Sequence, residues 1–319
     1  MRILFITASR IGDAVLSTGL LAHLVERHSD AAITVACGPA AAPLFEGVSQ
    51  VERRIVMAKR PWGGHWVSLW LASVGVRWDL VVDLRGSATA WLLSSRHRLV
   101  HRGNNGGGHR LTTLASVMDL AEPPSPRLWI TAEHETDAVQ LVPDGGPVLA
   151  LAPTANWAGK IWPAENFIAV AERLTAPGGI LPNARIAIFG AADERAIAQP
   201  VIDAIDPGRC IDLVGETHLL TAAAALGRCA LFVGNDSGLM HMAAAVGTPT
   251  LGLFGPSKAE TYAPWGPHCA VAQTATPYAA LFPPDYNHRT TGSLMESLRV
   301  DAVADAAAAL WGRCRGAAA

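Results

Sequence analysis

Short apolar runs alternate with amphipathic stretches along most of the chain. In its first part, the strand-like runs are RILFIT (2–7), AITVAC (32–37), RRIVMA (53–58), DLVVDL (79–84) and HRLVH (97–101). Stretches with helical spacing, such as Val15 to Arg27, lie between them. Near-continuous Val, Ile and Leu runs that alternate with helices predict a parallel sheet covered on both faces.

The pattern breaks at LAEPPSPRLWITAEHE (120–135), because three prolines in four positions cannot continue a helix or a central strand. We interpret this segment as the connection between domains. The alternation then restarts with PVLALA (147–152), RIAIFG (185–190), CIDLVG (210–215), ALFVGN (230–235) and TPTLGLFG (248–255). Helices are expected from Pro163 to Leu174 and from Val300 to Trp311.

This arrangement predicts an α/β protein with two tandem, Rossmann-like, doubly wound parallel-sheet domains around a cleft. We place the domains at 1–135 and 136–319, with the last helix a candidate to pack back on the first domain. The length of 319 residues, half of them hydrophobic, also favours two domains. Ligands of such sheets bind beyond the carboxyl ends of the strands, so the chemistry is sought in the strand-to-helix turns.

Composition and charge narrow the function classes. The formal net charge is −2, so no nucleic-acid partner is expected. Residues 1–122 hold 13 Lys and Arg against 9 Asp and Glu, which gives the first domain a mild positive excess. The five cysteines are scattered without metal-ligand spacing and are expected to be small buried residues in a reduced compartment. The chain starts on a strand rather than a signal peptide, so a soluble, cytoplasmic protein is expected.

The segment FVGNDSGLMHMAAAVGTPTLGLFGPS (232–257) is the most informative motif. A predicted strand ends at its first glycine, and Asn235, Asp236 or Ser237 can cap the following helix. Gly238 leaves the backbone open to close approach, and His241 can face the same turn. Plain capping and an interfacial histidine would explain each residue singly. Together, at the end of a strand, they favour an anion site for a diphosphate.

A second turn, LAPTANWAGKIWPAENF (151–167), indicates the same chemistry. Lys160 is one of only three lysines and lies between a strand and a helix, where it can reach a phosphate. Thr154 can donate its hydroxyl to the same group. A solvated loop lysine is an equally weighted alternative.

The first turn, ASRIGDAVLST (8–18), raises a different question, because it carries an acid and lacks the G-x-G-x-x-G fingerprint of dinucleotide-binding turns. A carboxylate repels phosphate, so Asp13 does not suit a phosphate-binding turn. Taken alone, Asp13 could simply cap the helix that follows Gly12.

Three segments together resemble family 9 glycosyltransferases, the ADP-heptose:lipopolysaccharide heptosyltransferases. They are MRILFITASRIGDAVLSTGLL, GKIWPAENF and GNDSGLMHMAAAVGTPTLGLFGPS, in the family's order. The resemblance implies the two-domain GT-B arrangement and inversion at the anomeric carbon, with no metal or other cofactor. The segment 281–303 departs from the family, because it lacks a cysteine-containing pattern found in many members.

The resemblance also implies roles for residues. Asp13 matches the acid proposed as general base, which takes the proton from an acceptor hydroxyl. Thr154, Lys160, Asp236, Ser237, Gly238 and His241 fall in the donor-binding segments of the second domain. In FGAADERAIA (189–198), Glu194 is the nearer match to an acid that contacts the nucleoside ribose, with Asp193 beside it. The implied partners are a nucleotide-sugar donor and an anionic glycolipid acceptor.

Residues 85–110 contain five arginines and three histidines but no acid, and the Gly-rich stretch HRGNNGGGHR (101–110) lies inside them. A solvated basic surface would explain any one of these arginines. Because arginine suits phosphates and acidic sugars, we expect this segment to hold the acceptor, with Arg102 and Arg110 the strongest candidates. We also expect it to bring the protein into transient, peripheral contact with the anionic inner face of the cytoplasmic membrane.

Three alternatives stay open on the sequence alone. A sugar-nucleotide epimerase can share this two-domain architecture. A catalytically silent sugar-nucleotide-binding protein would share the phosphate turns, although it would gain little from Asp13. A dehydrogenase is the least favoured, because neither half carries a dinucleotide fingerprint.

Overall fold

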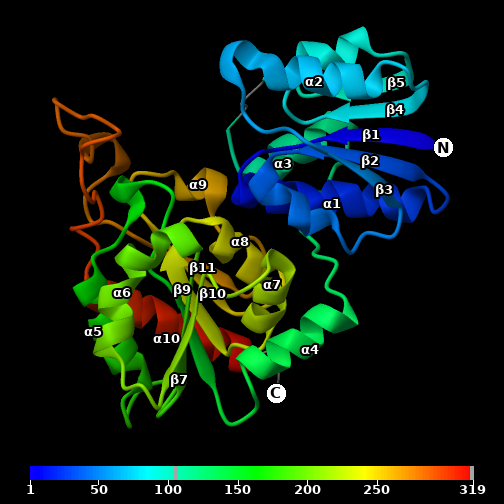
Figure 1. The fold of residues 1–319 in the computed structure, drawn as a ribbon. Helices are drawn as coiled ribbons and strands as arrows, with labels where there is room; N and C mark the ends of the chain where they lie inside the picture. The colour runs from blue at the N-terminus through cyan, green and yellow to red at the C-terminus, as the bar shows by residue number, and fades with distance from the viewer. Residues whose placement is uncertain (104–106, 317–319) are drawn as a thin grey trace. The chain divides into compact units, whose positions relative to one another are not determined.

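The computed structural model describes residues 1–103 and 107–316. The described chain forms two compact units, one of residues Met1–Trp129 and the other from Ile130 onward. The division falls within the proline-containing segment 120–135. The structure confirms two tandem α/β domains, each built on one parallel sheet (Figure 1).

The N-terminal domain has a five-stranded parallel sheet in the order β3-β2-β1-β4-β5. Its strands are β1 (Arg2–Ile6), β2 (Ala32–Cys37), β3 (Val51–Val56), β4 (Trp78–Asp83) and β5 (Ser95–Val100). On one face, α1 (Ile11–Arg27) packs with η1 (Pro39–Phe45) and α3 (Arg110–Ala115), which leads into η4 (Ser116–Met118). On the other face lie η2 (Pro61–Gly63), α2 (Gly64–Ser73) and η3 (Ala88–Leu92) (Figure 1).

The proline-containing connection is held against α1. A Cβ atom at Gly19 would lie 2.3 Å from the carbonyl oxygen of Pro124, so only glycine allows the two segments to come this close. The hydroxyl of Thr18 accepts a hydrogen bond of 3.0 Å from the backbone N–H of Arg127. The segment after α3 is therefore docked on its own domain.

The C-terminal domain has a six-stranded parallel sheet in the order β11-β10-β9-β6-β7-β8. Its strands are β6 (Val148–Ala152), β7 (Arg185–Gly190), β8 (Cys210–Val214), β9 (Leu231–Asn235), β10 (Thr250–Phe254) and β11 (Cys269–Gln273). Helix α5 (Ala164–Thr175) packs with α6 (Arg195–Ala204) and α10 (Val300–Gly316), and α7 (Leu219–Gly227) packs with α4 (Ala132–Leu141) and α8 (Gly238–Ala245). The shorter elements are η5 (Ala158–Lys160), η6 (Ala192–Glu194), α9 (Ala259–Tyr262) and η7 (Tyr278–Ala280).

The ten strands expected from the sequence lie within a few residues of their predicted positions. Strand β11 was missed, because CAVAQ is a short run of small residues with few of the large apolar side chains typical of strands. Helix α1 begins at Ile11, four residues before the expected start, so it includes Asp13. Helix α10 packs against α5, β10 and β11 of its own domain.

The cysteines and the lengths of the helices can be compared with what the sequence predicted. The five cysteines are unpaired, but only Cys37 and Cys229 are buried, whereas the other three are half-buried. Burial raises the pKa of the Cys37 thiol to about 12, which keeps it protonated and unreactive at neutral pH. Among residues 1–103 and 107–316, no helix is long and apolar enough to cross a membrane.

Each sheet reverses its winding direction beside its central strand. In the C-terminal domain, β6 lies between β7 and β9, so the chain winds outward first through β7 and β8, then through β9 to β11. In the N-terminal domain, β1 lies between β2 and β4 in the same way. Ligands of doubly wound sheets bind at such switch points, beyond the carboxyl ends of the strands.

Candidate functional site

The C-terminal switch point brings together two turns that are far apart in sequence. Thr154 and Lys160 follow β6, and Asp236 and Ser237 follow β9. Fully buried Asn235 fixes the two turns to each other. Its amide nitrogen donates to the carbonyl of Pro153 at 3.0 Å, and its side-chain oxygen accepts from the backbone N–H of Trp162 at 3.2 Å. Asn235 was expected to be one of three possible helix caps, and it is instead the link between both turns.

Lys160 and Asp236 form an ion pair across this junction. The Nζ–Oδ2 distance is 2.5 Å, and the side chains are 21% and 7% exposed. The other carboxylate oxygen of Asp236 lies 3.9 Å from Nε2 of His241, which is also buried. One buried carboxylate therefore lies between two basic groups. Lys160 is not a solvated loop lysine in this structure.

The N-terminus of α8 opens at the same junction. Ser237 occupies the N-cap position and Gly238 is the first helical residue, so free backbone N–H groups follow both. The Ser237 side chain does not cap the helix, and its Oγ atom is buried without a hydrogen-bond partner among the described residues. Ser257, after β10, has a similarly buried hydroxyl. Unmade hydrogen bonds of this kind are costly, so these hydroxyls are suited to a polar ligand.

Thr154 and Glu194 contact each other rather than standing free. The Thr154 hydroxyl donates to Oε2 of Glu194 at 2.6 Å, and the same oxygen accepts the backbone N–H of Ala191 at 3.0 Å. The Thr154 hydroxyl proton is therefore directed at the Glu194 carboxylate. Asp193, the neighbouring acid, is exposed. Oε1 of Glu194 has no hydrogen-bond partner within the described part of the chain, which leaves it open to a ligand hydroxyl.

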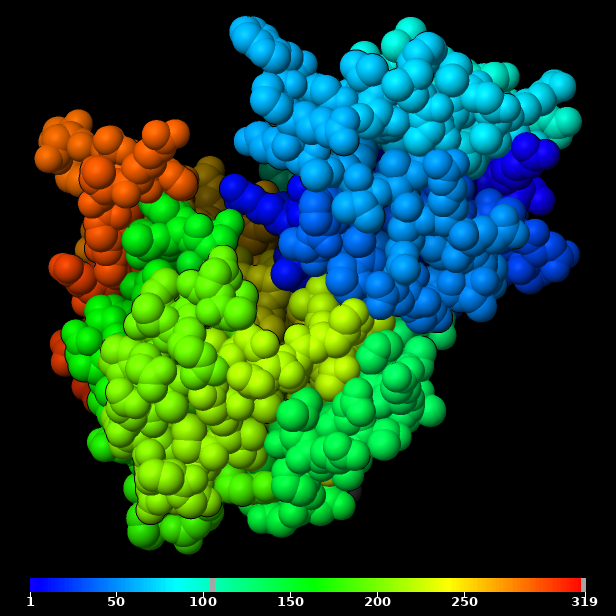
Figure 2. Space-filling view, viewed as in Figure 1, coloured from blue at the N-terminus to red at the C-terminus, as the bar shows by residue number. Residues whose placement is uncertain are grey.

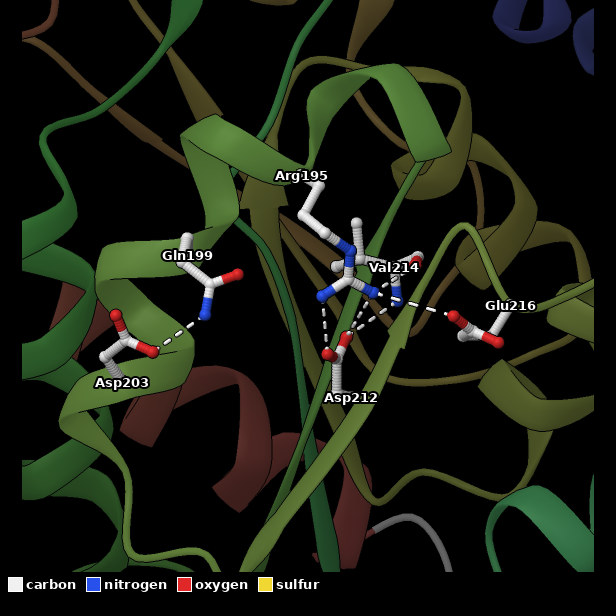
Figure 3. A network of polar contacts seen from close by, with 6 residues as sticks. All are labelled: Arg195, Gln199, Asp203, Asp212, Val214 and Glu216. Atoms are coloured by element: carbon white, nitrogen blue, oxygen red, sulfur yellow. Dashed lines mark hydrogen bonds and ion pairs between the residues drawn. The ribbon is translucent and has the colours of Figure 1, made fainter.

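A polar network fixes the start of α6 directly after Glu194 (Figure 3). Arg195 donates to Asp212 at 2.7 Å and to the carbonyl of Val214 at 2.6 Å, and its guanidinium lies 3.7 Å from Glu216. The hydrogen bond with Asp212 raises the pKa of Arg195 above its ordinary value. The network ties α6 to the end of β8 and so holds the turn that carries Glu194.

Residues 286–294 support the loop that carries Lys160. The Trp157 ring stacks on His288 with centroids 4.9 Å apart, and its Nε1 donates to the His288 carbonyl at 3.1 Å. The backbone N–H of Leu294 donates to the Gly159 carbonyl, and Ser293 donates to the Ile161 carbonyl. The segment that departs from the family pattern at the sequence level therefore shapes the Lys160 loop directly.

Asp13 lies in the first turn of α1, directly after the N-terminal switch point. It is the third residue of the helix, and Arg10 holds the N-cap position. The N-cap alternative for Asp13 is therefore wrong. The side chain is half-buried, and among the described residues no donor forms a hydrogen bond with its carboxylate.

Arg85, which the sequence analysis counted in the basic segment 85–110 without singling it out, lies at the same switch point. Strands β1 and β4 pair with Ile6 opposite Asp83, and Arg85 follows directly. Fully buried Asp83 accepts the backbone N–H groups of Arg85 and Ser87, at 2.8 and 2.7 Å, which fixes this turn. The Arg85 guanidinium donates to the Ser9 hydroxyl at 2.9 Å and lies 5.0 Å from the Trp66 ring centre. Its position in the turn directly after the predicted strand 79–84 was the one sequence signal, because the pairing of that strand with β1 is visible only in the structure.

The two arginines chosen from the sequence follow β5 in the chain, the strand that pairs with β4. Arg102 is exposed, and Arg110 is the half-buried first residue of α3. Residues 104–106 of the Gly-rich stretch lie outside the described residues. Burial and the Arg110 charge lower the pKa of His101, which follows β5. In the part of the chain that the structure describes, no group of three or more His, Cys, Asp or Glu could hold a metal ion.

Comparisons with known proteins find similarity over most of the chain. The model of glycosyltransferase family 9 (heptosyltransferase) matches residues 68–281. Lipopolysaccharide heptosyltransferase 2 of Salmonella typhimurium is 26% identical over 87% of this chain and 89% of its own length. Lipooligosaccharide heptosyltransferase 2 of Haemophilus influenzae is 24% identical over 81% of this chain and 84% of its own length. The solved structure of E. coli ADP-heptose lps heptosyltransferase II has the same fold, with a TM-score of 0.76 at 22% identity over 99% of this chain and all of that one.

Proposed function

The chain belongs to glycosyltransferase family 9, and from that premise we propose that it transfers heptose from ADP-heptose to a lipopolysaccharide-core or related glycolipid acceptor. Relatives that match it over most of their length are named as heptosyltransferases of lipopolysaccharide or lipooligosaccharide. The donor is inferred from the ADP-heptose enzyme that shares its fold. Neither the epimerase nor the non-catalytic alternative is favoured by this membership.

The convergence at the β6/β9 switch point carries the proposal for the donor. We assign the donor diphosphate to the N-terminus of α8, at Ser237 and Gly238, because free N–H groups and the helix dipole favour an anion there. Lys160 would exchange its contact with Asp236 for a phosphate oxygen, and His241 would face the same charge. Glu194, held by Thr154, would accept a hydrogen bond from a ribose hydroxyl through Oε1.

We assign the general base to Asp13. The acceptor hydroxyl oxygen would form a bond to the anomeric carbon while the bond from that carbon to the diphosphate breaks. The hydroxyl proton would pass to the Asp13 carboxylate, and ADP would leave with the electron pair. Because the nucleophile enters opposite the leaving group, the configuration would invert. Lys160, His241 and the α8 N-terminus would stabilise the leaving diphosphate without a metal.

The acceptor side of the proposal rests on the N-terminal domain. Arg102 and Arg110 would contact anionic groups of the acceptor, and Arg85 is a third candidate, since Ser9 and Trp66 hold it close to the turn after β1. In this proposal the N-terminal domain, residues 1–135, binds the acceptor and supplies Asp13, whereas the C-terminal domain, residues 136–319, binds the donor. The enzyme would be cytoplasmic, with transient peripheral contact at the inner face of the membrane where glycolipid acceptors lie.

Donor recognition can be tested before any acceptor is known. Thermal stabilisation by ADP-heptose, ADP, UDP and UDP-sugars should be compared at matched concentrations, because a ligand at about 100 times its Kd stabilises the native state by about 2.7 kcal/mol. We expect ADP and ADP-heptose to raise Tm, and Lys160→Ala to reduce that shift. Stabilisation by UDP-sugars alone would contradict the proposed donor.

A further inference from the structure

Helix α2 is apolar on the side that faces solvent as well as on the side that faces the sheet. Leu69 is fully buried, and Trp66 and Trp70 pack against the core formed by β1, β4 and their neighbours. Val67, Leu71 and Val74 are exposed, and their spacing places them in one stripe on the outer side. A helix that is hydrophobic all round normally has both sides covered.

Three neighbouring side chains extend this stripe into a patch. Trp70 links the stripe to η3. Helical spacing places it beside Val67 and Val74, and its Nε1 donates a hydrogen bond of 3.4 Å to the carbonyl of Leu92. Trp91 and Leu92 of η3 are themselves exposed, at 58% and 66%. At the other end Trp62 is fully exposed. We call the set the α2 patch, which consists of Trp62, Val67, Leu71, Val74, Trp91 and Leu92.

The backbone holds Trp62 in this exposed position. Its φ of 55° is in the left-handed region, which a bulky residue rarely adopts, and Gly63 follows with a φ of 71°. Figure 2 shows the light-blue segment around residue 60 standing out from the surface of its domain. This left-handed backbone is costly for a bulky residue, and here it presents an indole to solvent.

Cations border the α2 patch, and acids are absent from the segment that builds most of it. Residues 53–78 contain five Lys and Arg and no Asp or Glu. Two of these arginines are bonded to α2 itself, Arg60 to the Ser68 hydroxyl and Arg53 to the Ala72 carbonyl, both at 3.1 Å. Arg60, His65 and Ser68 also line a small hollow between α2 and the end of β3. The buried Nδ1 of His65 has no hydrogen-bond partner among the described residues.

We propose that the α2 patch docks the protein on an anionic membrane surface. Exposed Trp, Leu and Val side chains would enter the interface, where Trp is favoured, while Lys59, Arg60 and Arg53 contact lipid phosphates. A second copy of the chain fits less well, because a two-fold contact through this patch would place the cations of one copy against those of the other. The proposal rests on the proposed function, whose acceptor is a glycolipid, and it places the membrane contact on α2 rather than on Arg102 and Arg110.

The test is flotation of the full chain with vesicles of phosphatidylcholine alone or mixed with phosphatidylglycerol. We expect wild type to float with the anionic vesicles. Trp62→Ser/Leu71→Ser should lower the partition coefficient by about tenfold or more, because two large apolar side chains are removed. Lys59→Gln/Arg60→Gln should lower binding to anionic vesicles alone. The matched control, Val139→Ser/Ile197→Ser, removes exposed apolar side chains of the C-terminal domain and should float like wild type.

Transfer to a deacylated, water-soluble acceptor separates this proposal from the proposed function. The Trp62→Ser/Leu71→Ser variant should keep that activity and lose transfer to acceptor embedded in vesicles. If this variant floats like wild type, or if wild type does not float, the proposal that the α2 patch binds the membrane is wrong. Loss of a dimer in the variant with unchanged flotation would assign the patch to a second copy. If no protein acts on the soluble acceptor, the proposed function fails, and the flotation result still decides the surface.

Discussion

Lys160 and Asp236 form an ion pair of 2.5 Å between turns that are 76 residues apart in the sequence. The pair joins the carboxyl ends of β6 and β9, where the sheet reverses its winding direction. Both residues were chosen from the sequence as donor-binding candidates in separate segments, Lys160 as a phosphate contact and Asp236 as a possible helix cap. The carboxylate holds the lysine in this structure, so anion binding at this site would involve a change of partner for Lys160.

Removing the lysine should destabilise the free protein and weaken donor binding. Among the described residues, Lys160→Ala leaves the buried Asp236 carboxylate with only the more distant His241 as a basic neighbour, which should lower the free energy of unfolding by about 3 kcal/mol. The affinity for ADP should fall roughly 10- to 100-fold, the value of a charge-assisted hydrogen bond. Denaturant unfolding and calorimetry with ADP measure the two effects.

A matched ion pair provides the control for that prediction. Asp144 pairs with Arg228 at 2.6 Å but is 97% exposed. Asp144→Asn should change the free energy of unfolding by less than about 1 kcal/mol and leave ADP affinity unchanged. Equal effects of the two variants on stability, or an unaltered ADP affinity in Lys160→Ala, would contradict the assigned role of Lys160.

Asp13→Asn should keep donor binding and lose transfer. The amide has nearly the same shape but cannot take the acceptor proton, so we expect kcat to fall roughly 10²- to 10⁴-fold. ADP affinity should stay at the wild-type value, because Asp13 lies in the N-terminal domain. Normal turnover in this variant would mean that Asp13 has only a structural place in the first turn of α1.

Arg85→Ala should raise the acceptor KM by about tenfold while leaving ADP affinity unchanged. The guanidinium is positioned by Ser9 and Trp66, so Ser9→Ala should have a smaller effect in the same direction. Arg27→Ala, an exposed arginine in the last turn of α1, is the matched control. Equal acceptor KM values for Arg85→Ala and Arg27→Ala would remove Arg85 from the acceptor site.

Arg102→Ala/Arg110→Ala tests the acceptor residues chosen from the sequence. If both contact anionic groups, the acceptor KM should rise, and it should depend less on salt than that of wild type. The measurement is a set of KM values across a salt series. A double variant that matches wild type at every salt concentration would identify these arginines as ordinary surface residues.

The His101 environment predicts a dependence of stability on pH. Burial, together with the Arg110 charge, lowers the pKa of His101 in the folded protein below its unfolded value of about 6.5. In the window below that value the unfolded chain binds more protons than the folded one, so His101 reduces stability as the pH falls. The Tm of His101→Asn should therefore fall less than the Tm of wild type when the pH is lowered from about 7.5 to about 5.5. An identical loss in both proteins would contradict this account.

The sequence predicted the two sheets well, because near-continuous apolar strands and proline breaks are local signals. It also identified Asp13, Lys160 and Asp236 as candidates, through motifs at strand ends. It could not predict the pairing of Lys160 with Asp236 or the tie between Thr154 and Glu194. Those contacts depend on the strand order, which places β6 beside both β9 and β7.

Residues that act through tertiary position were missed for the same reason. Asn235 resembles a helix cap in sequence, yet it links two turns of the sheet. Arg85 is one arginine among several, and only the pairing of β1 with β4 places it beside Ser9. The α2 patch was missed because an apolar helix in a sequence is expected to be buried, and only the structure shows which of its sides is uncovered.

The most direct test of the account is the reaction itself. Wild type and Asp13→Asn are incubated with ADP-heptose and a deacylated lipopolysaccharide-core acceptor, and both ADP release and the mass of the acceptor are followed. The account predicts that wild type releases one ADP for each heptose added to the acceptor, with inverted configuration at the new bond. The Asp13→Asn variant should bind ADP-heptose but transfer heptose far more slowly than wild type. ADP-heptose that is consumed without any gain in acceptor mass, or converted to an epimeric sugar nucleotide, would contradict it.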